Sequence, residues 1–432
     1  MNKTIWSDIV INSYNKLEEN IECDVLIIGG GLAGVLSAYF LKNDGFDVVL
    51  VEMDRIGQRK TVKTTAVVTA LQDVFYHNLI KEIGLNKTKL YLDACTYSIK
   101  KYKELATKID FDYEEVSSYK YFKNDEENLK LEVDALKKLD FPFKLVDKVN
   151  LPLEFDLAIE FSEQGQFNPM KLIKELIKGI KIYENTKIIK LNDNIAYTEN
   201  HLIRANKIVV TTGFPFMKFK GLYSLKMYQN KSYVITVDNN LNFKGNIIGS
   251  KKEQLYFRDY NGKLIIGGND IETGYFNDGF LKLKEFNDKF NKSKIDYQWV
   301  NQDCITLDDL PYIGQFSYFS NHLYVATGFN LWGMTGAMLG AMIINDIISK
   351  TPNKYQALFN PSRLYKIKPL AVNLLNSLMN IMTFNERRCN HLGCSLVKDE
   401  DTDCYECPCH GSKYESNGKL LDGPAIKNLK NK

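Results

Sequence analysis

Residues 24–34 read Asp-Val-Leu-Ile-Ile-Gly-Gly-Gly-Leu-Ala-Gly, and this stretch decides the fold of the N-terminal half. An apolar run leads into three glycines spaced G-x-G-x-x-G, at Gly29, Gly31 and Gly34. A helical pattern and a second apolar run follow, and the second run ends at Glu52. Strand, glycine turn, helix and strand within about thirty residues predict a βαβ unit with a parallel sheet.

This spacing of glycines suits a dinucleotide. The first glycine permits the tight turn, the second lets the backbone approach a pyrophosphate, and the third allows the helix to pack closely on the strand. The helix N-terminus favours the phosphates, and an acid at the end of the next strand binds ribose hydroxyls. A glycine turn without a ligand is the alternative, but strand, helix and acid all occur where a dinucleotide site needs them. We therefore expect binding by Gly29, Gly31, Leu32, Ala33, Gly34 and Glu52.

Composition narrows the class of protein. The chain has 432 residues, of which 44% are hydrophobic and 25% charged, as in globular proteins of several units. The net charge of +3 is too small to argue for a nucleic-acid partner. No secretory signal is visible at the N-terminus, so we expect a cytoplasmic protein. We interpret the apolar stretch 325–344 as a glycine turn and core helix, and we expect no transmembrane segment.

The rest of the chain alternates between two patterns. Parallel α/β segments are interleaved with segments typical of an antiparallel sheet, which makes the predicted fold class α/β (α+β) within residues 1–368. An amphipathic linker helix and a short cysteine-rich end follow. The expected nucleotide segments are about 22–82, 165–222 and 300–350, the antiparallel segments about 83–164 and 223–299, the linker 369–383 and the end 384–432.

Further motifs carry a family resemblance. Besides the glycine turn, the chain contains four such motifs: Thr64-Thr65-Ala66, Thr211-Thr212-Gly213, residues 308–314 (DDLPYIG) and residues 326–335. With them, residues 22–350 resemble the flavoproteins that include D-amino-acid oxidase, glycine oxidase and sarcosine oxidase. The resemblance implies non-covalently bound FAD in a Rossmann-like domain and a substrate domain built on the antiparallel sheet. It adds the FAD contacts Thr64, Thr65, Gly213, Gly333, Met334 and Thr335, the last three at a helix N-terminus facing the flavin.

The substrate pocket departs from this family. Its amino-acid oxidases commonly carry an arginine before the P-x-I-G run that binds the substrate carboxylate, whereas this chain has Asp303. An acid there favours a cationic or neutral substrate, unless Asp303 is simply a solvated loop residue. Tyr256 and Arg258 face either the pocket or a surface strand pair, and Trp332 lines the pocket or packs in the core. The candidate catalytic residues are thus Arg258, Asp303 and Trp332.

The C-terminal end concentrates residues that bind metals. Two thiols and two imidazoles occur as C-x-H and C-x-x-H, separated by fifteen residues. A [2Fe–2S] cluster with mixed ligation needs two cysteines on one iron and two histidines on the other. Structural zinc is the alternative, because close Cys and His residues also form zinc ribbons. The residues concerned are Cys389, His391, Cys407 and His410.

This end resembles the Rieske family, in which the equivalents of these four residues ligate the cluster. The resemblance also implies a disulfide between Cys394 and Cys409, hydroxyl contacts from Ser412 and Tyr414, and a shielding loop at Gly423-Pro424-Ala425. Cys404 has no assigned role. The end is too short for the complete sandwich that supports such clusters, leaving a small all-β subdomain. We therefore expect this tip to pack on the flavin domain and to be held by its cluster.

Together these features predict an FAD-dependent oxidoreductase with a Rieske centre. It would oxidise a small amine or amino compound and pass electrons singly to a carrier, either a protein or a quinone. One alternative is a flavin reductase of an organic acceptor that is fed by the cluster. Another is a zinc-tipped flavoprotein with a redox-sensing or assembly role. The helix at 369–384 could dock on a membrane or a partner, but packing on the flavin domain is the more usual arrangement.

Overall fold

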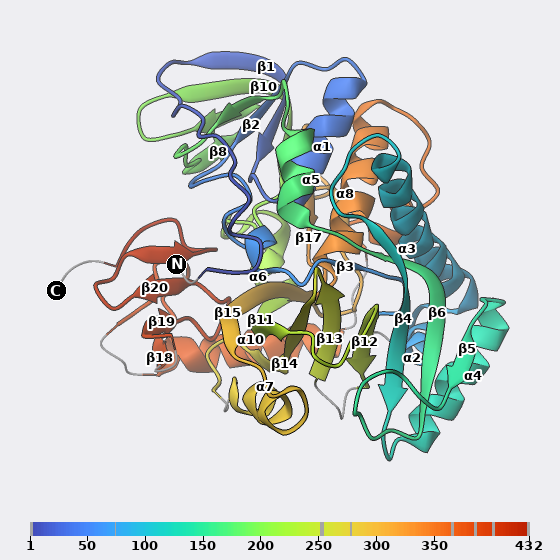
Figure 1. The fold of residues 1–432 in the computed structure, drawn as a ribbon. Coiled ribbons are helices and arrows are strands. Elements are labelled where there is room, and N and C mark those ends of the chain that lie inside the picture. Colours follow the sequence, from blue (N-terminus) through green and yellow to red (C-terminus); the bar gives the residue numbers. More distant parts are fainter. Residues whose placement is uncertain are drawn as a thin grey trace.

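The first of three sheets is mainly parallel. A computed structural model of the chain describes residues 3–73, 75–250, 255–276, 279–363, 367–383, 387–399 and 402–429. The strand order is β16-β17-β10-β1-β2-β7, with β9 and β8 added beside β10 (Figure 1). The strands are β1 (Ile21–Ile28), β2 (Val48–Val51), β7 (Lys181–Tyr183), β8 (Lys190–Asn192), β9 (Ile195–Tyr197), β10 (Leu202–Val210), β16 (Tyr312–Gln315) and β17 (Leu323–Thr327).

The second sheet is mainly antiparallel. Its order is β15-β11-β14-β13-β12-β4-β6-β3, and β5 pairs with β6. The turn at Asn261-Gly262, where both residues have positive φ, joins β13 to β14. The strands are β3 (Val67–Val68), β4 (Glu114–Phe122), β5 (Lys144–Val146), β6 (Leu157–Gln166), β11 (Met227–Asp238), β12 (Asn246–Gly249), β13 (Leu255–Tyr260), β14 (Lys263–Glu272) and β15 (Ile295–Thr306).

Helices cover the parallel sheet and flank both sheets. α1, α5, α8 and α3 pack side by side, and α1 with α8 forms much of the main hydrophobic core (Figure 1). The helices are α1 (Leu32–Asn43), α2 (Tyr76–Ile83), α3 (Leu85–Ala106), α4 (Glu126–Leu139), α5 (Pro169–Leu176), α6 (Tyr223–Lys226), α7 (Leu281–Phe286), α8 (Gly333–Ile348), α9 (Gln356–Phe359) and α10 (Ile367–Met382). Single turns are η1 (Thr61–Lys63), η2 (Lys220–Leu222) and the π-helical η3 (Asn287–Asn291).

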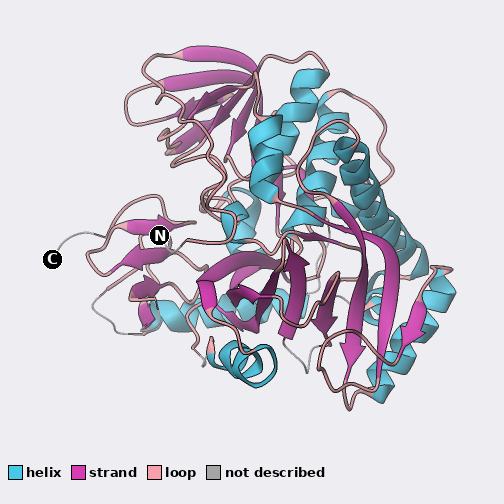
Figure 2. Cartoon of the chain, in the orientation of Figure 1, coloured by secondary structure: helices cyan, strands magenta, loops and turns pink. Residues whose placement is uncertain are grey.

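The third sheet forms the C-terminal tip. Its four strands are β18 (Val397–Asp399), β19 (Cys404–Glu406), β20 (Lys413–Glu415) and β21 (Leu420–Asp422). Figure 2 shows the tip as short strands and loops beside α10. Its small core consists of Cys389, Cys394, Leu396, Cys407, Cys409, Tyr414, Leu420 and Ala425. A core in which cysteines are so prominent has little aliphatic surface to hold it together.

The architecture confirms the predicted fold class, with two differences in detail. β15 extends the antiparallel sheet to Thr306, past the expected boundary at 300, because it pairs with β11 along its length. β3 lies in the antiparallel sheet although it falls in an expected nucleotide segment. The stretch 325–344 is buried, as expected, in β17 and α8. None of the described helices has both the length and the apolar character needed to cross a bilayer.

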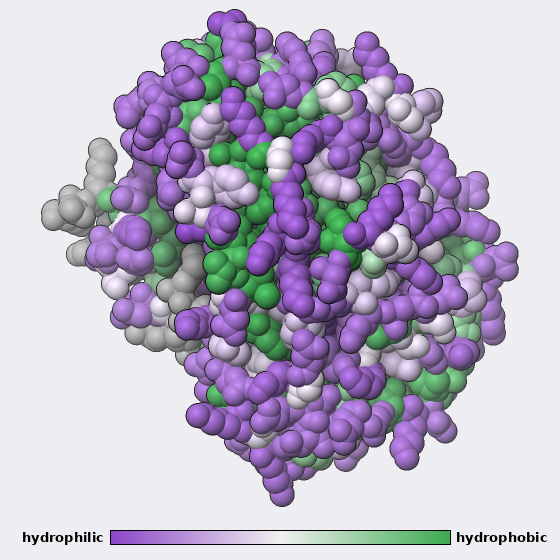
Figure 3. Space-filling view, turned by 45° about the horizontal axis from the view of Figure 1, so that its top comes forward, coloured by the Kyte–Doolittle hydropathy of each residue, from purple (hydrophilic) through white to green (hydrophobic). Residues whose placement is uncertain are grey.

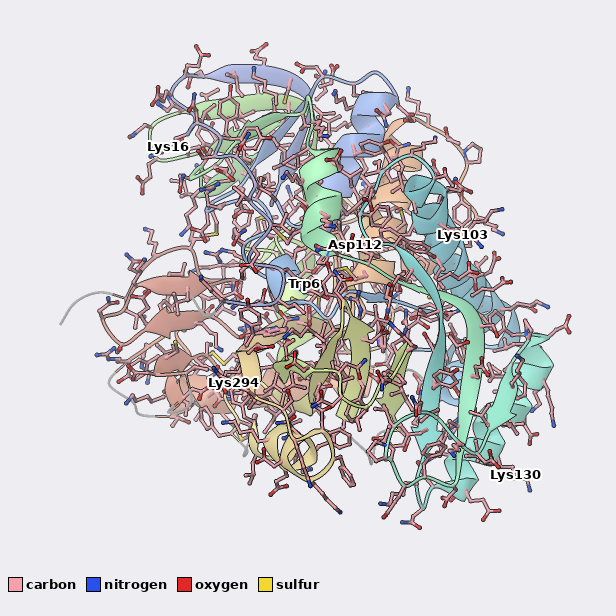
Figure 4. All side chains as sticks on the ribbon, viewed as in Figure 1. Trp6, Lys16, Lys103, Asp112, Lys130 and Lys294 are labelled. Carbon is pink, nitrogen blue, oxygen red and sulfur yellow. A yellow bond between two sulfur atoms is a disulfide. The ribbon has the colours of Figure 1, made fainter. Side chains whose placement is uncertain are left out.

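The interior between the two large sheets is where the predicted sites meet. Trp6 reaches it from the N-terminal segment and lies near the centre of the molecule (Figure 4). Its indole nitrogen donates to the carbonyl of Thr64 (2.7 Å). The face seen in Figure 3 is mostly hydrophilic, with an apolar strip near its middle.

Candidate functional site

The glycine turn after β1 forms one end of a cleft. Gly29 has φ +111°, a conformation that favours glycine, and α1 begins directly after the turn. A Cβ on Gly34 would lie 1.9 Å from the carbonyl oxygen of Gly29, so no larger residue fits. Glu52 directly follows β2. One of its carboxylate oxygens accepts a hydrogen bond from Gly30 N (2.7 Å), and the other accepts one from Asp54 N (2.9 Å). Burial raises the pKa of Glu52, and these two N–H groups oppose the rise.

Most of the predicted dinucleotide residues line this cleft. Those that do are Gly29, Gly31, Leu32, Ala33, Glu52, Thr64, Gly213, Gly333 and Met334. Gly34 instead packs on the backbone, and Thr335 Oγ1 donates to the carbonyl of Thr69 (3.2 Å), so both support the cleft from behind. Thr65 faces a neighbouring cavity. As expected, α8 begins at Gly333, so its N-terminus points at the cleft.

Sequence reasoning missed several residues of the cleft. Lys60, Thr61 and Lys187 line it, and so do residues 422–426 of the tip. Lys60 Nζ donates to Gln229 Oε1 (2.9 Å). Burial acts to lower the pKa of Lys60, but interactions with Cys304, Asp422 and Asp303 outweigh it and hold the pKa above its usual value. No local motif marks these residues, because segments distant in the chain bring them together.

A second cavity adjoins the cleft and contains all three candidate catalytic residues. Asn301, Asp303, Leu331, Gly333 and Met334 line both cavities. Arg258 and Trp332 line the second one, together with Tyr256, Asp73 and Asp270. Asp73 and Asp270 were not among the predicted residues. The second cavity therefore lies directly beside the cleft that the predicted dinucleotide residues line.

Acidic groups dominate the chemistry of this second cavity. Asp270 Oδ1 is shielded from solvent and has no hydrogen-bond partner among the described residues. Burial raises the pKa of Asp270 to about 7. Asp303 accepts a hydrogen bond from Asn301 Nδ2 (2.8 Å), and burial raises its pKa while Lys60 opposes the rise. Three acids, Asp73, Asp270 and Asp303, thus line the cavity together with two cations, Lys63 and Arg258.

Arg258 binds the backbone beside this cavity. Its guanidinium donates to the carbonyls of Thr65, Ala66 (2.9 Å) and Phe167 (2.9 Å), and only 1% of the residue is exposed. Burial lowers the pKa of Arg258 to about 10. These contacts fix the backbone that joins cleft and cavity and leave only Nε without a partner among the described residues. The positive charge is thus directed at backbone carbonyls.

The tip brings the four predicted metal ligands together. Cys389, His391, Cys407 and His410 are each at most 3% exposed, and the two imidazole rings lie 4.9 Å apart between centroids. Both Nδ1 atoms are buried and have no partner among the described residues. Burial lowers the pKa of His391 to about 3 and that of His410 to about 4, so both rings are neutral and able to ligate. This donor set fits a cluster held by two thiolates and two imidazoles.

The remaining cysteines of the tip support this assignment. Cys394 and Cys409 form a disulfide, which joins the two loops that carry the four residues. Their sulfurs lie close to Cys407 Sγ, all within 4.8 Å, but the disulfide occupies two of the three. Tyr414 Oη lies 3.5 Å from Cys389 Sγ, and Ser412 Oγ accepts from Ala425 N (3.0 Å). Cys404 lies outside this group, on β19.

The tip packs on the flavin half through polar contacts, as expected. His410 Nε2 lies 3.0 Å from the carbonyl oxygen of Ser224. Gln229 Nε2 donates to the carbonyl of His410 (2.6 Å), and Gln302 Nε2 donates to that of Gly411 (2.6 Å). A Cβ on Gly411 would lie 2.7 Å from both amide nitrogens. Any larger residue at this position would therefore push the tip away from the two glutamines.

A buried ion cluster reinforces the same interface. Lys231 on β11 contacts Asp399 (2.7 Å) and Glu406 (3.1 Å) of the tip, and each of these side chains is at most 1% exposed. Lys413 also pairs with Glu406 (2.7 Å). Buried charges are tolerated only when paired, so these residues tie the tip to one position on the second sheet.

Fold and geometry together define the class, an oxidoreductase that combines a dinucleotide cleft with a metal-cluster tip. The chain belongs to the FAD dependent oxidoreductase family, whose model matches residues 24–347. Residues 372–432 match the Rieske [2Fe–2S] domain. FAD and a Rieske [2Fe–2S] cluster are therefore its cofactors, and zinc is not needed to explain the tip.

Known relatives agree with this assignment. The Rieske 2Fe–2S iron–sulfur protein YhfW of Bacillus subtilis (strain 168) is 30% identical over 99% of this chain and 97% of its own length. The iron–sulfur subunit of the cytochrome b6-f complex of Synechococcus sp. (strain JA-3-3Ab) is 46% identical over 41 residues, 10% of this chain and 24% of its own.

Solved structures share the fold of the larger part. Glycine oxidase from Geobacillus kaustophilus matches with a TM-score of 0.69 and 17% identity, covering 80% of this chain and all of its own. L-proline dehydrogenase from P. horikoshii gives 0.68 and 18%, covering 80% of this chain and 98% of its own. At these identities the likeness establishes the fold.

Proposed function

We propose that this protein is a dehydrogenase of a small amine or amino compound that passes electrons singly to a carrier. When bound, FAD takes up the hydride equivalent that an amine releases on becoming an imine, and a Rieske cluster carries single electrons. Glycine oxidase and L-proline dehydrogenase, which share the fold, are named for substrates of this kind. The carrier, a protein or a quinone, accepts the electrons one at a time.

The observation that carries this proposal is a single loop that contacts both cofactor sites. Residues 422–426 line the dinucleotide cleft. Within this loop, Ala425 N donates to Ser412 Oγ (3.0 Å), in the segment that follows the ligand His410. Because one short segment separates the two sites, electron transfer between them within one molecule is the simplest use of the arrangement.

The acidic cavity supports an amine as the substrate. Asp270 and Asp303 offer carboxylates to an ammonium group, and Asp73 adds a third acid. Two cations also line the cavity, but Arg258 is bound to three carbonyls and burial lowers the pKa of Lys63. The cavity would therefore offer less opposite charge to a carboxylate substrate than to an ammonium substrate. We propose that Asp270 holds the amine and that Arg258 and Trp332 shape the cavity.

Groups of the chain around the dinucleotide cleft also favour this reaction. We propose that Glu52 binds the ribose and that the α8 N-terminus at Gly333–Thr335 faces the flavin ring. A helix N-terminus stabilises negative charge on a group in front of it, which favours uptake of a hydride there. Lys60, charged and buried between cleft and tip, adds a positive charge near the same region.

Anaerobic titration of the purified full-length protein tests the function. Small primary and secondary amines should bleach the flavin absorbance and then produce the EPR signal of a reduced Rieske cluster. The matching carboxylic acids without an amine should do neither. If no amine reduces the flavin while a reduced one-electron donor does, the reverse reaction, reduction of an organic acceptor, replaces this proposal.

Substitution of Asp270 tests the amine-binding group. Asp270→Asn removes one charge without changing size, and KM for the amine should rise at least about tenfold, equivalent to about 1.4 kcal/mol. In the unmodified protein, KM should fall as pH rises from 6 to 8, because Asp270 ionises near pH 7. Asp238→Asn, on the same sheet but 60% exposed, is the matched control and should leave KM unchanged. An unchanged KM in Asp270→Asn would remove Asp270 from the site.

A further inference from the structure

Helix α10 is packed with its polar side inward. Asn373 donates to the carbonyl of Leu225 (3.0 Å), and Ser377 is 7% exposed. Large apolar side chains point outward instead, with exposed fractions from 43% to 73%. They are Val372, Leu374, Leu375, Leu378, Met379 and Met382. Helices on globular proteins normally bury the apolar side, so this arrangement reverses the usual one.

The exposed residues form one continuous stripe. At 100° per residue, the six side chains span roughly 160° of the helix circumference. The polar residues Asn373, Ser377 and Asn380 occupy the opposite side. A stripe of this width along about 16 Å of helix is a surface for contact. α10 packs on the flavin domain, through α6, as expected, but it does so with its polar side inward.

Two lysines are exposed on the segment that precedes α6, the helix on which α10 packs. α10 packs against α6, and the segment just before α6 exposes Lys218, Phe219, Lys220 and Leu222. Phe219 is 74% exposed and Leu222 49%, which adds apolar area beside the lysines. The sequence has no acidic residue in 205–237 or in 355–385, the two segments that meet here.

We propose that α10 and residues 218–222 form a docking surface for an anionic membrane, with α10 lying flat in the interface. Apolar side chains beside lysines are the features by which interfacial helices bind such lipids. A second copy of the chain is a poorer occupant, because a two-fold contact would bury both sets of lysines and neither segment has an acidic residue to pair with them. A transient carrier protein is also a poorer occupant, because such encounters bury small, wet surfaces and would leave much of the stripe exposed.

The docked helix would lie between the lipid and the cluster ligands. Cys409 Sγ is 3.9 Å from the carbonyl oxygen of Ser377 on α10, and His410 Nε2 contacts Ser224 on α6. The ligand loop would thus sit about one helix diameter, ~10 Å, from the lipid. A lipid-soluble one-electron acceptor would then be within reach. That last step rests on the proposed function, whereas the docking itself does not.

Flotation of the purified full-length holoprotein with vesicles tests the docking. We expect it to float with vesicles of phosphatidylglycerol and phosphatidylcholine and much less with phosphatidylcholine alone. Leu375→Glu/Met379→Glu should weaken binding at least about tenfold. Lys218→Gln/Lys220→Gln should weaken binding to the anionic vesicles several-fold. Leu131→Glu, on α4 with 43% exposure, is the matched control and should bind as the unmodified protein does.

Circular dichroism and iron content should show that each variant keeps its fold and cluster. Absence of flotation, or flotation that Leu375→Glu/Met379→Glu leaves unchanged, would overturn the docking surface. A dimer in solution that the same double substitution dissociates would assign the stripe to a second copy instead. Because flotation needs no substrate, a failure here is distinguishable from a failure of the amine titration.

Discussion

The two cofactor sites of this protein are built in different ways. The dinucleotide cleft depends on the backbone: a glycine with positive φ, a glycine in contact with a carbonyl oxygen, and two helix N-termini. The tip depends on side chains, because its core contains the two thiol ligands and the disulfide beside few aliphatic residues. A backbone site exists whenever the sheet and helices form. A site made of side chains on a small tip also needs its metal and its contacts with the larger part.

The largest effect expected from this contrast is loss of FAD on substitution of one glycine. In Gly34→Ala the new Cβ would lie 1.9 Å from the Gly29 oxygen, so α1 must move off the turn. Flavin content, measured by absorbance after gel filtration, should fall to about a tenth or less. Gly45→Ala is the control: at φ +91° it strains the backbone away from the cleft, but its Cβ would meet no atom within 4 Å, so it should keep its flavin. Full flavin content in Gly34→Ala would show that the cleft does not depend on this close contact.

A smaller effect is expected from Lys231→Met, which tests the contacts that hold the tip. The change leaves Asp399 and part of the Glu406 charge buried without their lysine. Breaking a buried pair from one side costs about 3–5 kcal/mol. Hydrogen exchange of residues 387–429, followed by mass spectrometry, should show a correspondingly lower free energy of opening.

The control for Lys231→Met is Lys263→Met. Lys263 also pairs with two acids but is 34% exposed. Its loss should cost no more than about 1 kcal/mol. Equal hydrogen exchange in the two variants would mean that the buried cluster does not anchor the tip.

The smallest effect concerns the acidic cavity beside the dinucleotide cleft. Asp270 has a folded-state pKa of about 7, above the ordinary 3.8, so ionisation opposes folding and stability falls as pH rises between these values. Asp270→Asn removes this dependence. The difference in melting temperature, variant minus unmodified protein, should therefore be a few degrees larger at pH 8 than at pH 5. A pH-independent difference would show that the carboxyl group is solvated.

Several features were predictable because they depend on short-range patterns. Gly29, Gly34 and Glu52 lie within one βαβ unit, whose chain path follows from alternating apolar runs and glycines. Cys389, His391, Cys407 and His410 occur in two short motifs, so their chemistry was evident before their geometry. Arg258 was a candidate from the sequence, with a surface strand pair as the alternative. Its contacts with the carbonyls of residues 65–66 depend on strand pairing that no local pattern reveals.

The two cofactor classes could be read from the chain alone, since glycine spacing and ligand spacing are properties of neighbouring residues. Four other features depend on how the chain folds: Asp270 facing the second cavity, Lys231 beneath the tip, residues 422–426 in the dinucleotide cleft and the outward apolar stripe of α10. These contacts join segments far apart in the chain. Which side of a helix or strand meets which neighbour depends on how all the elements pack at once.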